Sequence, residues 1–231
     1  MIVVLDPGIG NLSSVQSGFS RVGGETMVVK SGQEWEDLLS RQQTDSSDAS
    51  SVREISGVVL PGVGAFGDAM FQLRRSGLLP VVKRVAKEGM PLFGICLGMQ
   101  ILFSHSEEHG SHIGLGLLPG NVVRFTGDYK IPHMGWNNLV GVRSHPLLRG
   151  IQNGEFVYFV HSYYAKAEDE NHLLAAADYA GAKVAAVVGR DNVVGTQFHP
   201  EKSGQVGEKI LANFVAMCKA YAARAGVSSN G

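Results

Sequence analysis

The chain has 231 residues, of which 44% are hydrophobic and 18% charged, a balance typical of a globular enzyme with a substantial core. Its 20 basic and 21 acidic side chains give a formal charge of −1, which argues against a nucleic-acid-binding or membrane-surface protein. Two cysteines, Cys96 and Cys218, are too few for a disulfide framework and suit a reducing, cytoplasmic compartment. We expect one domain over residues 1–231, without a membrane span.

The first third of the chain alternates apolar runs with helical patterns. Residues 1–5 are apolar without alternation, which predicts a buried parallel strand, and Asp6 and Pro7 end the run too early for a signal peptide. Asn11 can cap a helix that continues to residue 22. Further strands are expected at residues 27–29 and 57–60, with a short helix at residues 35–39. The Ser- and Asp-rich segment 41–53 predicts a mobile surface loop.

The strand at residues 57–60 leads into a glycine-rich loop, Gly62-Val63-Gly64, at its C-terminal end. Ligands bind at this end of the strands in open α/β sheets. A helical pattern over residues 78–88 follows, with Gly89 as its stop and Pro91 before the next strand. This alternation predicts an α/β fold: an open, mostly parallel, doubly wound sheet flanked by helices.

An apolar strand ends at Cys96, and a helical pattern over residues 97–103 begins directly after it. Gly94 and Gly98 permit a cramped turn that a Cβ would obstruct, and the N–H groups of a helix N-terminus stabilise a thiolate. A similar elbow carries the nucleophile of G-x-S-x-G hydrolases. Cys96 is therefore a candidate nucleophile; the alternative is a small buried cysteine between tightly packed glycines.

Beyond residue 103 the character of the sequence changes. Glycines and short β runs, at residues 122–124 and 136–142, predict an antiparallel β extension rather than a second domain. A strand over residues 156–160 ends at His161, and strands at 184–188 and 193–197 predict a hairpin with a four-residue turn. The last helix contains Cys218, which we interpret as structural, and residues 224–231 are expected to fray.

The strand at residues 193–197 leads to His199, Pro200 and Glu201. A spacing of two places His199 and Glu201 on one side of an extended chain, with the φ angle of Pro200 fixed between them. Glu201 could then accept a hydrogen bond from one imidazole nitrogen, leaving the other to take the proton of Cys96. A lone histidine after a strand is more often structural, but together with the cysteine elbow it completes a set of nucleophile, base and orienting carboxylate.

These motifs resemble the Cys-His-Glu triad of the class I glutamine amidotransferases. Five further segments narrow the resemblance to the glutaminase subunits of imidazole glycerol phosphate synthases: residues 6–12, 61–66, 114–120, 133–137 and 159–163. The resemblance covers residues 1 to about 221. It implies hydrolysis of glutamine to glutamate and ammonia, without a cofactor, by Cys96 as nucleophile, His199 as base and then acid, and Glu201 as its orienting partner.

The resemblance also implies the rest of the site and a partner. Backbone N–H groups of Leu97 and of the loop Gly62, Val63 and Gly64 are expected to stabilise the oxyanion. Glutamine is held by a set of four residues, Gly64, Gln100, Ser162 and Tyr163. The partner is a (β/α)8 cyclase, which forms a heterodimer with the chain and uses the ammonia in histidine biosynthesis.

One segment with two large apolar residues suggests where that partner docks. Met134 and Trp136 are large apolar residues on either side of Gly135, in a stretch otherwise rich in turn residues. Such residues are enriched at protein interfaces, so we predict a docking surface. The alternative is a strand that buries Trp136 in the core.

Other functions remain open or are disfavoured. The triad alone does not distinguish a glutaminase subunit that serves a different ammonia-accepting synthase. A stand-alone cysteine hydrolase of α/β-hydrolase type places the acid between nucleophile and histidine, whereas Glu201 follows His199, and a non-enzymatic module would not need a triad. We expect no metal site, because three nearby histidines lack acidic or cysteine ligands and are expected to face solvent: His105, His109 and His112. Gly8-x-Gly10 lacks the remaining NAD-fingerprint residues.

Overall fold

A computed structural model of the chain describes residues 1–8, 10–44 and 54–228. Its centre is a seven-stranded sheet in the order β11-β12-β13-β4-β3-β1-β2. Five neighbouring strands are parallel: β2 (Thr26–Val29), β1 (Ile2–Leu5), β3 (Gly57–Gly62), β4 (Leu92–Cys96) and β13 (Val193–Thr196). The antiparallel strands β12 (Ala182–Arg190) and β11 (Leu173–Tyr179) complete one edge. The predicted open, mostly parallel sheet is confirmed.

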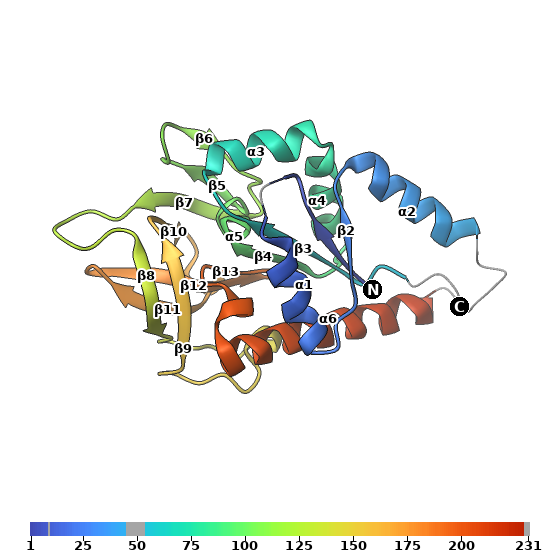
Figure 1. The fold of residues 1–231 in the computed structure, drawn as a ribbon. Coiled ribbons are helices and arrows are strands. Elements are labelled where there is room, and N and C mark those ends of the chain that lie inside the picture. Colours follow the sequence, from blue (N-terminus) through green and yellow to red (C-terminus); the bar gives the residue numbers. More distant parts are fainter. Residues whose placement is uncertain (9, 45–53, 229–231) are drawn as a thin grey trace.

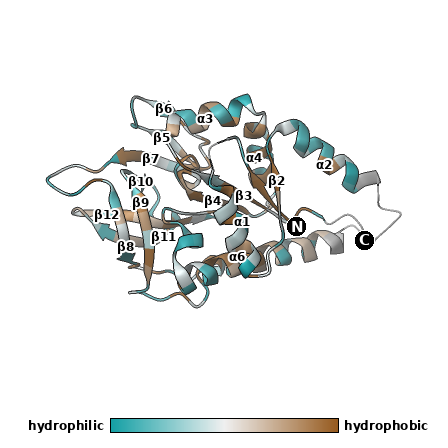
Figure 2. Cartoon of the chain, viewed as in Figure 1, coloured by the Kyte–Doolittle hydropathy of each residue, from teal (hydrophilic) through white to brown (hydrophobic). Residues whose placement is uncertain are grey.

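Helices cover both faces of this sheet (Figure 1). On one face lie α1 (Leu12–Arg21) and α6 (Gly204–Ser228); on the other lie α2 (Gly32–Thr44), α3 (Phe66–Arg75) and α4 (Leu78–Lys87). Strand β1 shows why its sequence has no polar alternation: Ile2 and Val4 pack in the cluster that includes Phe214 of α6, whereas Val3 and Leu5 pack with the opposite helices. In Figure 2 the central strands are accordingly hydrophobic and the helices carry hydrophilic outer faces.

A β extension follows the cysteine elbow. One sheet has the order β10-β7-β5-β6, with β5 (Phe103–Ser106), β6 (His112–Ile113), β7 (Leu118–Arg124) and β10 (Tyr163–Ala167). A separate antiparallel pair is formed by β8 (His133–Asn138) and β9 (Phe156–His161). The extension is antiparallel as predicted except that β5 and β7 pair in parallel, and its strand at 136–142 begins and ends earlier than expected. Figure 1 shows β8 and β9 at the opposite end of the molecule from α2.

Several boundaries differ from the prediction. Helix α2 continues to Thr44 and α6 to Ser228, so residues 41–44 of the predicted loop and residues 224–228 of the predicted tail are helical; residues 45–53 and 229–231 lie outside the described residues. The β12–β13 hairpin turns over Asp191 and Asn192 alone, because the two residues before them remain paired, and Asp191 takes a φ of 53°. Asn11 occupies the N-cap position of α1 without a side-chain capping bond.

Helix α3 was missed by the sequence analysis, because no local residue caps it. Its N-cap position is Ala65, and its first N–H group, on Phe66, donates to the carboxylate of Glu108, 42 residues further along the chain (2.7 Å).

Cys218 lies on α6 and is buried, as predicted, with its thiol against Gly57; burial raises the pKa of this thiol to about 12. Among the described helices, none combines the length and apolarity that crossing a membrane requires.

Candidate active site

Cys96 lies at the end of β4, and the helix α5 (Leu97–Gln100) starts at the next residue. Its backbone has φ 55° and ψ −111°, a region that residues with a side chain rarely occupy and that is associated with functional sites. The flanking glycines serve close packing: a Cβ on Gly98 would overlap the carbonyl oxygen of Leu60, and one on Gly94 would lie 2.7 Å from the carbonyl oxygen of Gly98. The predicted elbow is therefore present, and the strained φ belongs to the cysteine itself.

The helix after the elbow is shorter than predicted. It ends at Gln100, and Phe103 already begins β5. The carbonyls of Ile101 and Leu102 accept hydrogen bonds from the N–H groups of Leu115 and Leu117 (2.9 Å each) instead of extending the helix. The backbone N–H groups of this single turn, rather than a long helix dipole, are thus what the helix offers to the site.

His199 and Glu201 form the predicted contact, Nδ1 to Oε1 at 2.8 Å, with side chains only 7% and 2% exposed. The predicted extended chain between them is wrong: the 3-10 turn η3 (Pro200–Lys202) brings the carboxylate to Nδ1 of the ring. The backbone of His199 is held at both ends, because its N–H donates to the Tyr158 carbonyl (3.1 Å) and its carbonyl accepts from the Ser203 hydroxyl (2.7 Å). The imidazole is therefore fixed in place.

Burial alone would lower the pKa of His199, but hydrogen bonds and charge interactions with Cys96 and Glu201 outweigh it and raise the pKa to about 9. The ring is consequently protonated at neutral pH, and Nδ1–H donates to Glu201. A cationic imidazole beside a thiol stabilises the thiolate and is also a ready proton donor. These are the two properties that acyl transfer through a cysteine requires.

Cys96 and His199 open into a cavity of about 330 Å³. Six of the predicted oxyanion and substrate residues line the same cavity: Val63, Gly64, Leu97, Gln100, Ser162 and Tyr163. Gly62 is the exception, since it pairs with Cys96 in the sheet, and a Cβ on it would lie 3.0 Å from the backbone nitrogen of Gly98. Residues from the loop after β3, from β4 and α5, and from β9 and β10, far apart in sequence, thus converge on a space suited to a small molecule.

The orientation of Gln100 is determined by its neighbours. Its Nε2 donates to the carbonyl oxygen of Tyr163 (2.8 Å) and to Oε1 of Gln197 (2.9 Å), so both amide protons are used. Only its carbonyl oxygen remains free to bind a ligand, and that atom is a hydrogen-bond acceptor.

Three residues of this cavity, Glu108, Val160 and His161, were not candidates from the sequence. Glu108 lies in the turn between β5 and β6, and one of its oxygens caps α3, as described above. His161 ends β9, where it looks like an ordinary strand residue. Nothing in their spacing indicates a site, because tertiary packing alone brings them to the cavity. Of the three histidines expected in solvent, His105 and His109 are exposed, whereas His112 is half-buried against Gly67.

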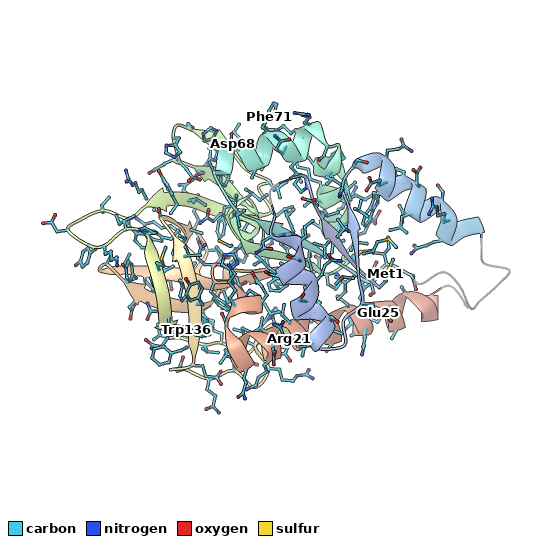
Figure 3. All side chains as sticks on the ribbon, viewed as in Figure 1. Met1, Arg21, Glu25, Asp68, Phe71 and Trp136 are labelled. Carbon is cyan, nitrogen blue, oxygen red and sulfur yellow. The ribbon has the colours of Figure 1, made fainter. Side chains whose placement is uncertain are left out.

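The predicted docking segment lies on the surface of β8. Met134 is 59% exposed and Trp136 is 56% exposed, with Gly135 between them at φ 131°. Figure 3 shows Trp136 at the periphery of the molecule, and its ring contacts that of Tyr158 on β9 edge-to-face (6.0 Å). The alternative that Trp136 belongs to the core is therefore wrong.

Comparison with known proteins identifies the class to which this fold belongs. The family model for glutamine amidotransferase class-I matches residues 3–218. A crystal structure of a glutamine amidotransferase aligns with a TM-score of 0.68 and 18% identity, over 94% of this chain and 98% of that chain. A chain of the PurLQS structure from Thermotoga maritima aligns with a TM-score of 0.67 and 19% identity, over 96% and 98%. The protein belongs to the class-I glutamine amidotransferase family.

Relatives narrow its place in that family. The imidazole glycerol phosphate synthase subunit HisH of Syntrophotalea carbinolica is 48% identical over 221 residues, which cover 93% of this chain and 98% of the relative. The HisH subunit of Halobacterium salinarum is 48% identical over 225 residues, covering 94% and 93%. The chain thus belongs to the HisH branch of the class-I glutamine amidotransferases.

Proposed function

We propose that this protein is the glutaminase subunit of an imidazole glycerol phosphate synthase. It hydrolyses glutamine to glutamate and ammonia and passes the ammonia to a (β/α)8 cyclase, which forms imidazole glycerol phosphate and aminoimidazole carboxamide ribonucleotide in histidine biosynthesis. The observation that carries the proposal is the convergence of Cys96 and His199 on one small cavity, in a chain of the HisH branch. Its free cysteines, Cys96 and Cys218, support a reducing, cytoplasmic location.

In the proposed mechanism, the Cys96 thiolate attacks the δ-carbon of glutamine. A C–S bond forms, and the carbonyl electron pair moves onto the oxygen. Collapse of this intermediate breaks the C–N bond while protonated His199 gives its proton to the leaving nitrogen, which departs as ammonia. Water then attacks the γ-glutamyl thioester and gives a proton to neutral His199, so that glutamate leaves and the thiolate–imidazolium pair returns. Glu201 holds the ring in position throughout.

Backbone N–H groups are the proposed stabilisers of the oxyanion. Leu97 begins α5, where N–H groups have no partner within the helix, and Val63 and Gly64, which directly follow Gly62 at the end of β3, line the same cavity. Gly64 has a φ of 101° and open space around it, so glycine is needed for the backbone conformation and not for packing.

The cavity walls suit the amino-acid end of glutamine. Gln100 offers an acceptor only, and Glu108 retains one carboxylate oxygen besides the one that caps α3. Two acceptors, one of them anionic, favour the α-ammonium group of the substrate. Ser162 and Tyr163 line the same cavity, and we place the substrate's remaining contacts there.

The docking strand, which we define as β8 with its exposed Met134 and Trp136, is the proposed contact with the cyclase. Phe156 on the neighbouring strand β9 is also 56% exposed and pairs with Asn138 at the end of β8. Exposed aromatic and methionine side chains on one face of this strand pair are the kind of anchors that interfaces bury.

The test uses the complex with the cyclase, supplied either with glutamine or with an ammonium salt. Cys96→Ser should abolish glutamine-dependent product formation while ammonium-dependent formation continues, and Cys218→Ala serves as the matched cysteine control. Retention of more than a small fraction of the glutamine-dependent rate in Cys96→Ser would overturn the assignment. Glutamine hydrolysis without any binding to the cyclase would instead indicate a different acceptor synthase.

A further inference from the structure

A continuous chain of hydrogen bonds connects the docking strand to the sulfur of Cys96, and one backbone carbonyl determines its direction. The carbonyl oxygen of Tyr163 accepts from Nδ1 of His161 (2.9 Å) and from Nε2 of Gln100 (2.8 Å). A carbonyl oxygen can only accept, so both partners must be donors. The proton positions on either side follow from this single constraint.

The first arm runs outward to β8. Because His161 carries its proton on Nδ1, its Nε2 is bare in the neutral ring and must accept from Nδ1 of His133 (3.0 Å). Nε2 of His133 is then bare as well and accepts from the side-chain amide of Asn137 (3.3 Å). That amide also donates to the carbonyl of Asp178 (3.0 Å), which independently identifies the atom as nitrogen. The carbonyl groups of Tyr163 and Asp178, at the two ends of this arm, thus require the same direction of donation: Asn137 donates to His133, His133 to His161, and His161 to Tyr163.

Both rings are neutral, as this order requires. Burial lowers the pKa of His133 to about 4. Burial, opposed by the hydrogen bond to the Tyr163 carbonyl and assisted by the neighbouring His133 and His199, lowers the pKa of His161 to about 3. His133 is in addition clamped between aromatic rings, stacked on Tyr179 (3.8 Å between centroids) and on Phe159 (4.6 Å).

The second arm runs inward to the nucleophile. Gln100 uses its second amide proton on Oε1 of Gln197 (2.9 Å), which leaves the Nε2 of Gln197 facing Sγ of Cys96 at 3.8 Å. Gln197 is fully buried, so no water competes for its amide. The sulfur therefore receives an N–H group whose orientation is set by the Tyr163 carbonyl, and an N–H donor stabilises a thiolate.

The outer end of the chain lies on the strand proposed to bind the cyclase. Along β8, His133 and Asn137 alternate with Met134 and Trp136, so the buried chain and the exposed anchors occupy opposite faces of one strand. His133 is directly opposite His161 in the β8–β9 register. A displacement of β8 on docking would therefore move the first donor of the chain.

We propose that His133 is a positioning residue, and that the chain Asn137–His133–His161–Tyr163–Gln100–Gln197 couples the docking strand to the nucleophile. This inference rests on the proposed function, and it includes the expectation that binding of the cyclase raises the glutaminase rate of the same site. The two neutral Nδ1–H histidines transmit the position of β8 to the Tyr163 carbonyl, and the two glutamine amides carry it to the thiolate. Loss of the His133 donor leaves Nε2 of His161 as a buried acceptor without its partner.

Two substitutions of His133 separate the contribution of its hydrogen-bond donor, Nδ1–H, from that of its aromatic ring. In His133→Asn the side-chain amide lies where Nδ1 was and can still donate to His161, whereas in His133→Gln it lies where Nε2 was and cannot. Both lose the same aromatic stacking. We expect His133→Gln to lower the stimulation of glutaminase activity by cyclase by about three- to tenfold, consistent with one buried hydrogen bond, and His133→Asn to stay within about twofold of wild type. The KM for glutamine and the affinity for cyclase should be unchanged.

A second measurement does not depend on turnover. In protein labelled with ¹⁵N-histidine, the imidazole signals of His133 and His161 should both report the Nδ1–H tautomer, without titration between about pH 5.5 and 8. An Nε2–H tautomer or a titrating signal would overturn the inference. So would equal stimulation in the two variants, whether both match wild type or both lose it. A wild-type complex that hydrolyses no glutamine would refute the proposed function, and this inference with it.

Discussion

Replacing Glu201 with glutamine tests the electrostatics of the site with little change in shape. The amide introduced by Glu201→Gln would still offer an oxygen to Nδ1–H of His199, so orientation is retained while the negative charge is lost. Raising the pKa of His199 from 6.5 to about 9 corresponds to about 3 kcal/mol in favour of the protonated ring, at ~1.4 kcal/mol per pH unit. Cys96 and Glu201 share this effect, and their near-complete burial leaves little solvent screening.

The assay is the pH profile of kcat/KM for glutamine in the cyclase complex. We expect kcat/KM to decline on the basic side near pH 9 in wild type, and at a pH at least ~1 unit lower in Glu201→Gln. Glu208→Gln is the matched control, because Glu208 also pairs with a cation, Arg21 at 2.9 Å, but its side chain is exposed and does not line the cavity. An unchanged limb in Glu201→Gln, indistinguishable from that of Glu208→Gln, would refute the triad assignment.

The same shift predicts how stability depends on pH. The folded-state pKa of His199 is raised, so its interactions stabilise the fold fully below pH 6.5, and this contribution is lost as the pH rises through about 9. The stability deficit of Glu201→Gln relative to wild type should consequently be largest at pH 6 and shrink towards pH 10. Thermal unfolding at a series of pH values measures this; a deficit that grows with pH would contradict the assigned protonation of the ring.

Two further predictions concern the elbow and the docking strand. Gly98→Ala places a methyl group into the carbonyl oxygen of Leu60, so it should lower the free energy of unfolding by ~1–3 kcal/mol, measured by chemical denaturation, and abolish glutaminase activity, measured by glutamate release. A variant as stable as wild type would show that the close packing of α5 is unimportant. Trp136→Ala should weaken cyclase binding by at least ~1 kcal/mol, measured by calorimetric titration. Because Trp136 is 56% exposed, the melting temperature of the isolated subunit should change little. The opposite pattern would make Trp136 a structural residue.

The sequence predicted those parts of the site that depend on local chain geometry. An apolar strand, two glycines and a cysteine sufficed for the elbow around Cys96, and a spacing of two residues sufficed for the contact between His199 and Glu201. The backbone conformation predicted between these two residues was nevertheless wrong, because a 3-10 turn, not an extended chain, brings their side chains together. Short spacings constrain which side chains meet more strongly than they constrain the backbone path between them.

The remaining features depend on contacts between distant segments. Helix α5 stops at Gln100 because the carbonyl groups that would continue it accept hydrogen bonds from N–H groups of residues 114–118. Helix α3 starts at Phe66 because Glu108, in another loop, caps it. The pair formed by His133 and His161 depends on the register of β8 against β9, which a single sequence does not reveal. Each of these residues looks ordinary in its own segment.

The most direct test of the central claim is to trap the covalent intermediate. The cyclase complex is denatured by acid while it turns over glutamine, and the peptides are analysed by mass spectrometry. We expect a γ-glutamyl thioester on the peptide that contains Cys96, absent from the peptide that contains Cys218 and absent in Cys96→Ser. Steady turnover of glutamine with Cys96 unmodified, or unimpaired turnover in Cys96→Ser, would contradict the account.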